Sequence, residues 1–226
     1  MGTCGRGPFS EELEAAYAYL YTLAARGFVD TPDEEFVSAV RSDLTLDAAL
    51  LLGEFGHRGS RVADSLESMR ANISCCTPSA YADLFMGPGG VKVVIWESAV
   101  RTATRSLFQK GTLDVRECYA REGFVVQGYP RVSDDQLGTE LSFMAALCTK
   151  ALDAHNRGDV EERDRVSLSR RAFGTDHLLQ WCKLVIEELQ RFDKGRFWIA
   201  CATMAFELLN CDCGFCNVDE AEVSKA

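Results

Sequence analysis

The sequence predicts an all-α protein, a single-domain helical globule of about ten helices. Apolar residues recur at intervals of three and four along most of the 226-residue chain, and helix-capping and helix-stopping residues separate these stretches. Only residues 91–96 have the composition of a β-strand. Since that short run has no obvious partner for a sheet, we expect it to be an extended loop segment.

Start and stop signals define the first five helices. They are expected to begin near Ser10, Thr31, Asp47, Ser60 and Thr77. Gly27 should end the first helix, because glycine readily adopts the positive φ that closes a helix. Thr31 should cap the second, with Glu34 completing a capping box. The Gly-Pro-Gly-Gly run of residues 87–90 should end the fifth.

Beyond the loop segment the chain returns to helices. They are expected at residues 97–108, at 115–122, from Ser133 to a break at 155–158, from Asp159 onward, and around 178–189 and 198–209. Ser133 should cap the longest of these helices, with Gln136 in the box position. Arg170 and Arg171 fall at the end of a charged helix, where cations interact favourably with the last carbonyl groups.

The organisation and charge of the chain narrow the range of its partners. Without a long linker or an internal repeat, we expect one domain over residues 1–212 and a short acidic tail over 213–226. The 24 Lys and Arg residues against 34 Asp and Glu residues give a net charge of −10, which repels nucleic acid and anionic lipid and attracts basic peptides. No apolar run approaches the roughly 18–20 residues of a membrane-spanning helix, and we see no secretory signal. We therefore expect a cytoplasmic protein that binds no nucleic acid and does not insert stably into membranes.

Catalytic and cofactor-binding motifs are missing from the sequence. Three histidines are few for general acid–base chemistry. The nucleophile elbow, the phosphate-binding loop and the paired-histidine zinc motif are all absent. We therefore expect neither an enzyme nor a resident cofactor.

Seven of the ten cysteines fall into two groups. Single cysteines within apolar helical stretches, such as Cys148 and Cys201, are typical of small buried side chains. By contrast, Cys211, Cys213 and Cys216 follow a Cys-x-Cys-x-x-Cys pattern, and their three thiolates are candidate ligands for a soft metal. The alternative function is therefore a metal- or thiol-responsive helical regulator that uses this C-terminal cluster.

Two segments combine aromatic and acidic residues around a loop that leads into a helix. The first runs from Tyr81 to Pro88 and continues at Trp96-Glu97-Ser98; the second contains Tyr129-Pro130, Asp134-Asp135-Gln136 and Glu140-Leu141-Ser142-Phe143-Met144. Periodicity places Leu84, Phe85 and Leu141 in the core. Capping accounts for acids at the start of a helix. Trp96 and Glu97, beside a Gly-rich loop, are better candidates for a functional role.

In this order, the two segments resemble the TorD/DmsD/NarJ family of molybdoenzyme-specific redox enzyme maturation chaperones. The matching residues are Tyr81, Leu84, Phe85, Gly87 and Pro88, then Trp96, Glu97 and Ser98, and then Asp135, Glu140, Leu141, Phe143 and Met144. The resemblance is clearest over residues 80–212. One difference is Gln136, which stands where the family has a histidine. Glutamine forms hydrogen bonds but does not change its charge near neutral pH.

The resemblance implies a TorD-like fold and a cytoplasmic, system-specific chaperone of anaerobic respiration. Such a chaperone binds the N-terminal twin-arginine leader of a molybdopterin-containing oxidoreductase catalytic subunit and supports cofactor insertion and assembly before export. It is a monomer or a helix-exchanged homodimer. The leader-binding residues that the resemblance implies are Trp96, Glu97, Ser98, Asp135, Gln136 and Glu140, supported by Leu84, Phe85 and Leu141. Glu97 and Asp135 are expected to contact arginine.

Overall fold

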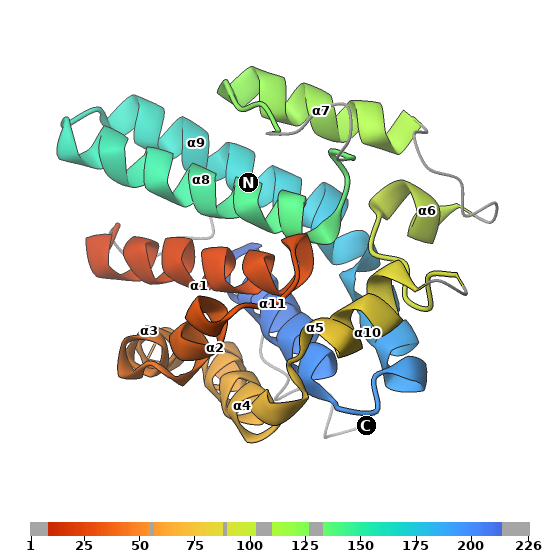
Figure 1. Ribbon diagram of the computed structural model, residues 1–226. Coiled ribbons are helices and arrows are strands. Elements are labelled where there is room, and N and C mark those ends of the chain that lie inside the picture. The colour runs from red at the N-terminus through yellow and green to blue at the C-terminus, as the bar shows by residue number, and fades with distance from the viewer. Residues whose placement is uncertain (1–8, 55–56, 88–89, 103–109, 127–132, 214–226) are drawn as a thin grey trace, which may run out of the picture.

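The computed structural model describes residues 9–54, 57–87, 90–102, 110–126 and 133–213 (Figure 1). Its α-helices are α1 (Glu11–Val29), α2 (Glu34–Arg41), α3 (Asp43–Gly53), α4 (His57–Ala71), α5 (Pro78–Tyr81), α6 (Glu97–Arg101), α7 (Lys110–Glu122), α8 (Leu137–Asn156), α9 (Val160–Phe173), α10 (Leu179–Phe192) and α11 (Phe197–Cys213). Short turns of 3-10 or π-helix are η1 (Ile73–Cys75), η2 (Ala82–Met86) and η3 (Gly174–Leu178). No β-strand occurs within the described ranges, so the predicted all-α fold is confirmed.

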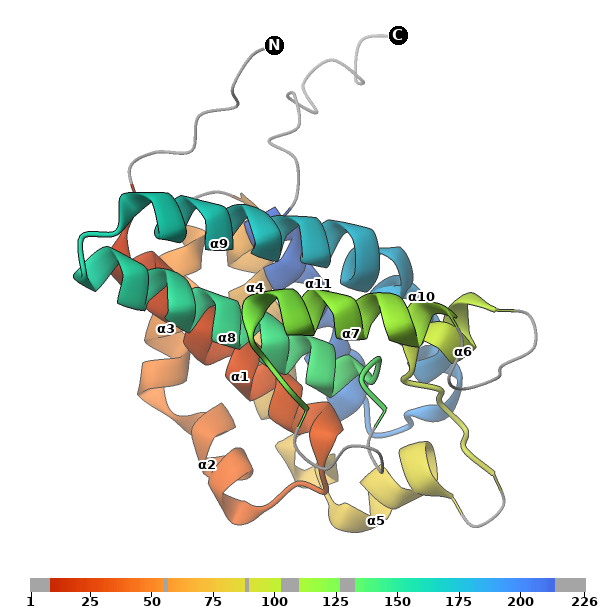
Figure 2. The same ribbon diagram turned by 90° about the horizontal axis from the view of Figure 1, so that it is seen from above.

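The centre of the fold is the antiparallel pair formed by α1 and α8, which lie side by side in Figures 1 and 2. At one end of the pair, the Gln136 side chain donates to the Phe28 carbonyl oxygen near the end of α1 (2.5 Å). At the other end, His155 Nε2 lies 3.0 Å from the Glu11 carboxylate. Helix α9 packs against α8, and α11 contacts both α1 and α4. This pair therefore joins the two halves of the chain.

Aromatic side chains fill the interior where α1, α5, η2 and α11 meet. The rings of Phe28, Tyr81, Phe85 and Trp198 have centroids 5.0–6.0 Å apart. The Trp198 indole donates to the Gly27 carbonyl oxygen (3.0 Å), and the Tyr81 hydroxyl donates to the Phe28 carbonyl oxygen (2.9 Å). These bonds satisfy carbonyl groups at the end of α1 that have no partner within the helix.

Local signals set several helix boundaries as predicted. Ser10 caps α1, Thr77 caps α5 and Asp159 caps α9, each side chain accepting a backbone N–H of the first turn. Gly123 follows α7 with φ of 79°, and Gly158 follows α8 with φ of 72°. Residues 91–95 form a loop with a bend at residues 92–93 and do not join a sheet, as expected.

Gly27 and Thr31 do not have the roles in ending α1 and capping α2 that the sequence predicted. The helix continues past Gly27 to Val29. Gly27 instead permits the close approach of α11, because a β-carbon there would lie 2.6 Å from the sulfur of Cys201. The cap of α2 is Asp33 rather than Thr31. Its charged carboxylate is the better acceptor at the positive end of a helix dipole.

The longest helix also begins later than predicted. Its cap is Gln136 and not Ser133, because the Gln136 side-chain oxygen accepts the Thr139 N–H (3.0 Å). The Ser133 hydroxyl donates to the Asp135 carboxylate instead. Residues 133–136 thus form a turn held by its own side chains.

Further boundaries differ, among them the starts of α4 at His57 and of α7 at Lys110, where the sequence predicted Ser60 and residue 115. Helix α3 begins at Asp43, because Ser42 caps it. Helix α6 covers only the first part of the predicted 97–108 helix, and residues 103–108 lie outside the described part of the chain. Helix α11 extends to Cys213, one residue beyond the predicted end of the domain. None of the described helices combines the length and the hydropathy needed to cross a bilayer.

The position of Arg170 also differs from the prediction that it lies beside the last carbonyl groups of its helix. It is fully buried, with its guanidinium paired with Asp212 and Glu14, rather than placed beside the last carbonyl groups of α9. Its partners come from α11 and α1, which the periodicity of α9 alone does not reveal.

Candidate functional site

A groove of about 670 Å³ opens on the surface where segments distant in the sequence meet. Its walls come from the end of α1 (residues 29–31), Tyr81 and η2, residues 95–96, the stretch after α7 (residues 124–126) and the first turns of α8. We call it the α8 groove. Most of the side chains that line it are apolar or aromatic, as in pockets that bind organic ligands or peptide side chains.

One face of α8 forms the length of the α8 groove. Gln136, Thr139, Phe143 and Ala146 line it at intervals of three and four residues, which places them on the same side of the helix. At 1.5 Å per residue, this face extends for about 15 Å. The rim carries Met86 and Val125, whose exposed fractions are 66 % and 85 %. An elongated apolar surface is therefore open to a partner.

The two segments that resemble the chaperone family lie against one another beside the α8 groove. The Glu97 N–H donates to the Asp135 carbonyl oxygen, and the Leu137 N–H donates to the Ile95 carbonyl oxygen, both at 2.9 Å. Between these bonds, Trp96 and Gln136 form an isolated antiparallel bridge. The structure thus brings residues 96–98 and 135–136 together, and both Trp96 and Gln136 line the groove.

Asp135 lies beneath the surface of the groove. Its exposed fraction is 0 %. One carboxylate oxygen accepts the Ser98 N–H (2.9 Å) at the start of α6, and the other accepts the Ser133 hydroxyl. The carboxylate therefore holds the short helix α6 against the turn before α8.

Glu97 is buried as well, with an exposed fraction of 1 %. Its carboxylate lies 2.9 Å from His177 Nδ1 and 2.5 Å from Arg101. In this structure both carboxylates expected to contact arginine already have partners. A leader peptide in the groove would meet neither of them directly.

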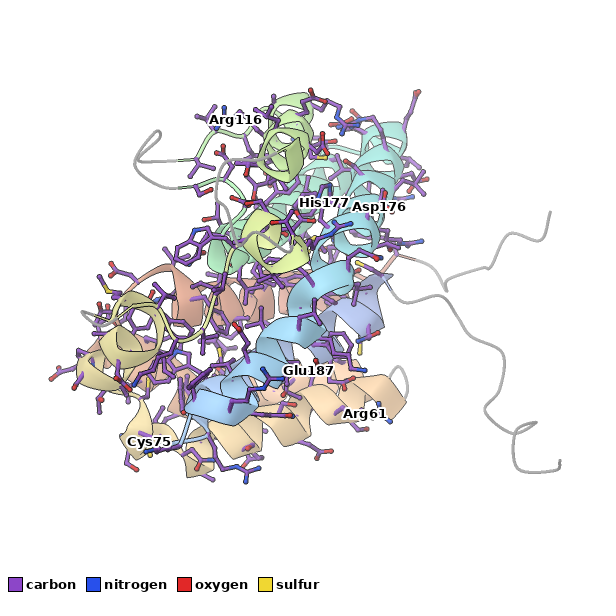
Figure 3. The ribbon with its side chains drawn as sticks, turned by 90° about the vertical axis from the view of Figure 1, so that its right-hand side faces the viewer. Arg61, Cys75, Arg116, Asp176, His177 and Glu187 are labelled. Carbon is purple, nitrogen blue, oxygen red and sulfur yellow. The ribbon has the colours of Figure 1, made fainter. Side chains whose placement is uncertain are left out.

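His177 is the central group of this buried charge cluster. It lies in η3, just before α10, and α10 contacts α6 (Figure 3). Burial lowers its pKa, but contacts with Cys118 and Glu97 outweigh that effect and raise the pKa to about 10. His177 is therefore charged near neutral pH. The sequence signal was slight, because a single histidine in a helical stretch is usually a core residue.

Glu140, like Asp135, is fully buried, with an exposed fraction of 0 %. Burial raises its pKa well above the usual range, and the charge of Glu97 acts in the same direction. Its carboxyl group thus favours the uncharged form. Glu140 is not among the residues that line the α8 groove.

The three expected support residues differ in their positions. Phe85 lines the α8 groove, whereas Leu84 and Leu141 are buried behind it. The Leu84 carbonyl oxygen accepts the N–H groups of Lys92 and Val93 at 3.1 and 3.0 Å. It therefore fixes the bend in the loop that leads to Trp96.

Several groove residues were not singled out from the sequence. Asp30 and Thr31 follow α1, and residues 124–126 follow α7. The apolar run Phe124-Val125-Val126 directly after the stop at Gly123 was an available signal, because apolar residues outside a helix often cover a binding site. Tyr129 and Pro130, which the sequence analysis did single out, lie outside the described residues.

The C-terminal cysteines occupy the last turn of α11 as far as the structure describes them. Cys213 is buried and Cys211 is half-buried, while Cys216 lies outside the described residues. Nowhere in the described ranges do three or more His, Cys, Asp or Glu side chains form a group suited to a metal ion.

A family match agrees with the resemblance of the two segments. The sequence model of the nitrate reductase delta subunit family matches residues 62–187, more than half of the chain. The crystal structure of a protein described as a redox enzyme maturation protein, from Archaeoglobus fulgidus, is 16 % identical, with coverage of 91 % of this chain and 98 % of that one and a TM-score of 0.41. No curated protein matches the sequence significantly. On the strength of the family match, this chain belongs to the nitrate reductase delta subunit family, the NarJ/TorD-type chaperones of redox enzyme maturation.

Proposed function

We propose that this protein is a cytoplasmic chaperone that binds the N-terminal leader of a molybdopterin-containing oxidoreductase catalytic subunit. By holding the leader, it would keep the subunit from export until its cofactor is inserted and assembly is complete. The observation that carries this proposal is the α8 groove, an open and mostly apolar surface lined in part by the two segments that resemble the family.

The chemistry of the α8 groove suits such a leader. A leader of this kind has a basic part followed by an apolar part. An apolar segment about two turns long fits a 15 Å helix face, and burying its side chains contributes roughly 25 cal/mol per Å² of apolar surface. The net charge of −10 attracts the basic part over a longer range.

The expected site residues take three roles in this proposal. Trp96 and Gln136 contact the leader, and Phe85 forms part of the wall behind it. Ser98, Asp135 and Glu97 hold α6 and the turn before α8 in position. The remaining expected residues, Glu140, Leu84 and Leu141, support that arrangement from the interior. In this assignment Gln136 is also the cap of α8, a role that does not require the family histidine.

The proposal is tested by purifying the tagged full-length protein from its own host, grown anaerobically. Mass spectrometry of the proteins that copurify should identify the client, the subunit that this chaperone binds. We expect an oxidoreductase subunit that binds molybdopterin and still carries its leader. Recovery of the same subunit with the leader already removed would contradict the proposal, as would recovery of no such subunit under several electron acceptors. Elemental analysis of the same preparation tests the alternative regulator, which requires stoichiometric zinc or iron.

A charge at the rim of the groove tests the binding surface. Met86 is 66 % exposed and lines the groove, so Met86→Lys should fold normally while placing a cation where the apolar part of the leader packs. We expect the affinity for the identified leader peptide, measured by fluorescence anisotropy, to fall at least tenfold, or about 1.4 kcal/mol.

The matched control is Leu168→Lys. Leu168 is 65 % exposed on α9 and does not line the groove. Its substitution adds the same charge to the same chain, so any loss of affinity common to both variants reflects net charge alone. Equal affinities of the two variants would show that the leader binds elsewhere.

A further inference from the structure

The charge in the α8 groove is unevenly distributed. Among the described residues that line it, Asp30 is the one carboxylate, and none is Lys, Arg or His. Asp30 is exposed and is the C-cap of α1. It therefore lies at the end of the groove where α1 meets the start of α8.

The end of α1 reinforces the charge of Asp30. A helix carries a partial negative charge at its C-terminus, because its last carbonyl groups point outward. The Asp30 carboxylate accepts the Thr31 N–H (2.7 Å), which restrains its position. Burial and the charge of Asp30 raise the pKa of the neighbouring Tyr81 to about 12, so that its phenol stays neutral. The Asp30 carboxylate and the helix end together suit a cation at this point.

The other acidic residues near the groove are unsuited to binding a cation of the peptide. Asp135 and Glu97 are buried and hydrogen-bonded to groups of the protein, and Glu140 is fully buried behind the groove. A cation bound in the groove would have to displace those groups to reach them. Asp30 requires no such rearrangement.

The opposite end of the α8 groove is apolar. Along α8 the lining residues proceed from Gln136, beside α1, to Phe143 and Ala146. Phe124 faces Phe143 with ring centroids 5.6 Å apart. The antiparallel packing of α1 and α8 thus separates a site for a cation from a site for apolar side chains, by up to about 15 Å along α8.

We propose that the α8 groove binds its peptide in one direction, with a basic side chain at Asp30 and the end of α1 and the following apolar residues along α8 toward Ala146. This inference rests on the proposed function and specifies the basic subsite of the same groove. Because the basic part of a leader precedes its apolar part, the peptide runs parallel to α8. In helical form, apolar residues three, four and seven positions after the basic one would face α8.

A charge-exchange experiment tests the basic subsite. The probe is a fluorescein-labelled synthetic peptide with two arginines followed by a helix-forming run of leucine, alanine and serine. Asp30→Asn should weaken binding of this probe about fivefold, and should leave unchanged the binding of a probe with glutamine in place of both arginines. Asp30→Lys should bind a probe with glutamates at these positions more tightly than the wild type does. Asp47→Asn, an exposed acid on α3 outside the groove, is the matched control and should bind like the wild type.

Photo-crosslinking tests the direction. A benzophenone seven residues after the arginines should label the α8 peptide that contains Phe143 and Ala146, while a benzophenone next to the arginines should label the segment around Asp30. The opposite labelling pattern would overturn the direction.

Equal binding of the arginine probe by wild type, Asp30→Asn and Asp30→Lys would overturn the subsite, even if Met86→Lys abolishes binding and the proposed function stands. If Met86→Lys also leaves binding unchanged and no molybdopterin-binding subunit is recovered, the proposed function itself fails.

Discussion

Arg170 ties three helices together through a buried ion pair network. Its guanidinium lies 2.9 Å from the Asp212 carboxylate of α11 and also pairs with Glu14 of α1. The Tyr21 hydroxyl donates a further bond to Asp212 (3.1 Å). All of these side chains are buried, so each charge depends on the others for compensation.

Arg170→Met should therefore strongly destabilise the protein. Methionine has a similar length but no charge, so Glu14 and Asp212 would remain buried without a cation. We expect the free energy of unfolding, from urea denaturation followed by circular dichroism, to fall by about 3–5 kcal/mol. Arg61→Met is the matched control, because Arg61 is 63 % exposed and lies 3.8 Å from Glu207, and it should cost less than about 1 kcal/mol. A similar small loss for both variants would contradict a structural role for the network.

At the scale of secondary-structure elements, the spacing between α1 and α8 determines the width of the α8 groove near Asp30. Gly138 lies at this contact. A β-carbon on Gly138 would be 2.6 Å from a Val29 methyl group and 2.8 Å from both the Ala25 carbonyl oxygen and the Val29 amide nitrogen. Because two of these atoms are backbone, a side chain rotation cannot relieve the contact.

Gly138→Ala should separate the two helices and destabilise the protein by about 1–3 kcal/mol. Gly53→Ala is the matched control. A β-carbon on Gly53 would meet atoms no closer than 3.6 Å, so it should be neutral or slightly stabilising through helix propensity. Thermal denaturation of the two variants under identical conditions provides the comparison. Equal melting temperatures would show that the α1–α8 contact adjusts freely.

At the scale of the whole molecule, the cluster around His177 links five helices. His177 faces Glu97 of α6, Cys118 of α7 and Glu140 of α8, and its ring stacks on Phe173 of α9 (4.8 Å). It precedes α10 directly. The charge state of this one residue thus affects how α6 and α7 are held against the rest of the protein.

The free energy of unfolding should fall as the pH rises from 6.5 to about 10, because His177 loses its charge over this interval. The pKa of His177 is raised from 6.5 to about 10, so the stabilisation it contributes is fully present below pH 6.5 and is lost as the pH approaches 10. His177→Gln should show a weaker fall between these pH values in urea denaturation. His155→Gln, at the end of α8 and outside the cluster, should keep the dependence of the wild type. If the free energy of unfolding falls equally in the wild type and in both variants, groups other than His177 cause the pH dependence.

The all-helical fold and most helix starts follow from short stretches of sequence. Ser10, Thr77 and Asp159 each cap a helix through a bond to a residue three positions away, and apolar spacing of three and four residues identifies a buried face. The motifs also placed Trp96 and Gln136 in one candidate site, and both line the α8 groove. Interactions of this kind are local, so a single sequence contains them.

Packing between distant segments decided which polar groups face the groove. Glu97 and Asp135 are acidic residues beside loops in the sequence, yet contacts with His177 and Ser98 place them in the interior. Asp30 follows a helix end that has no functional motif in the sequence, yet it is the one carboxylate among the described residues that line the α8 groove. Whether a charge is buried or open to a partner depends on the segments that pack over it, and those segments lie far away in the chain.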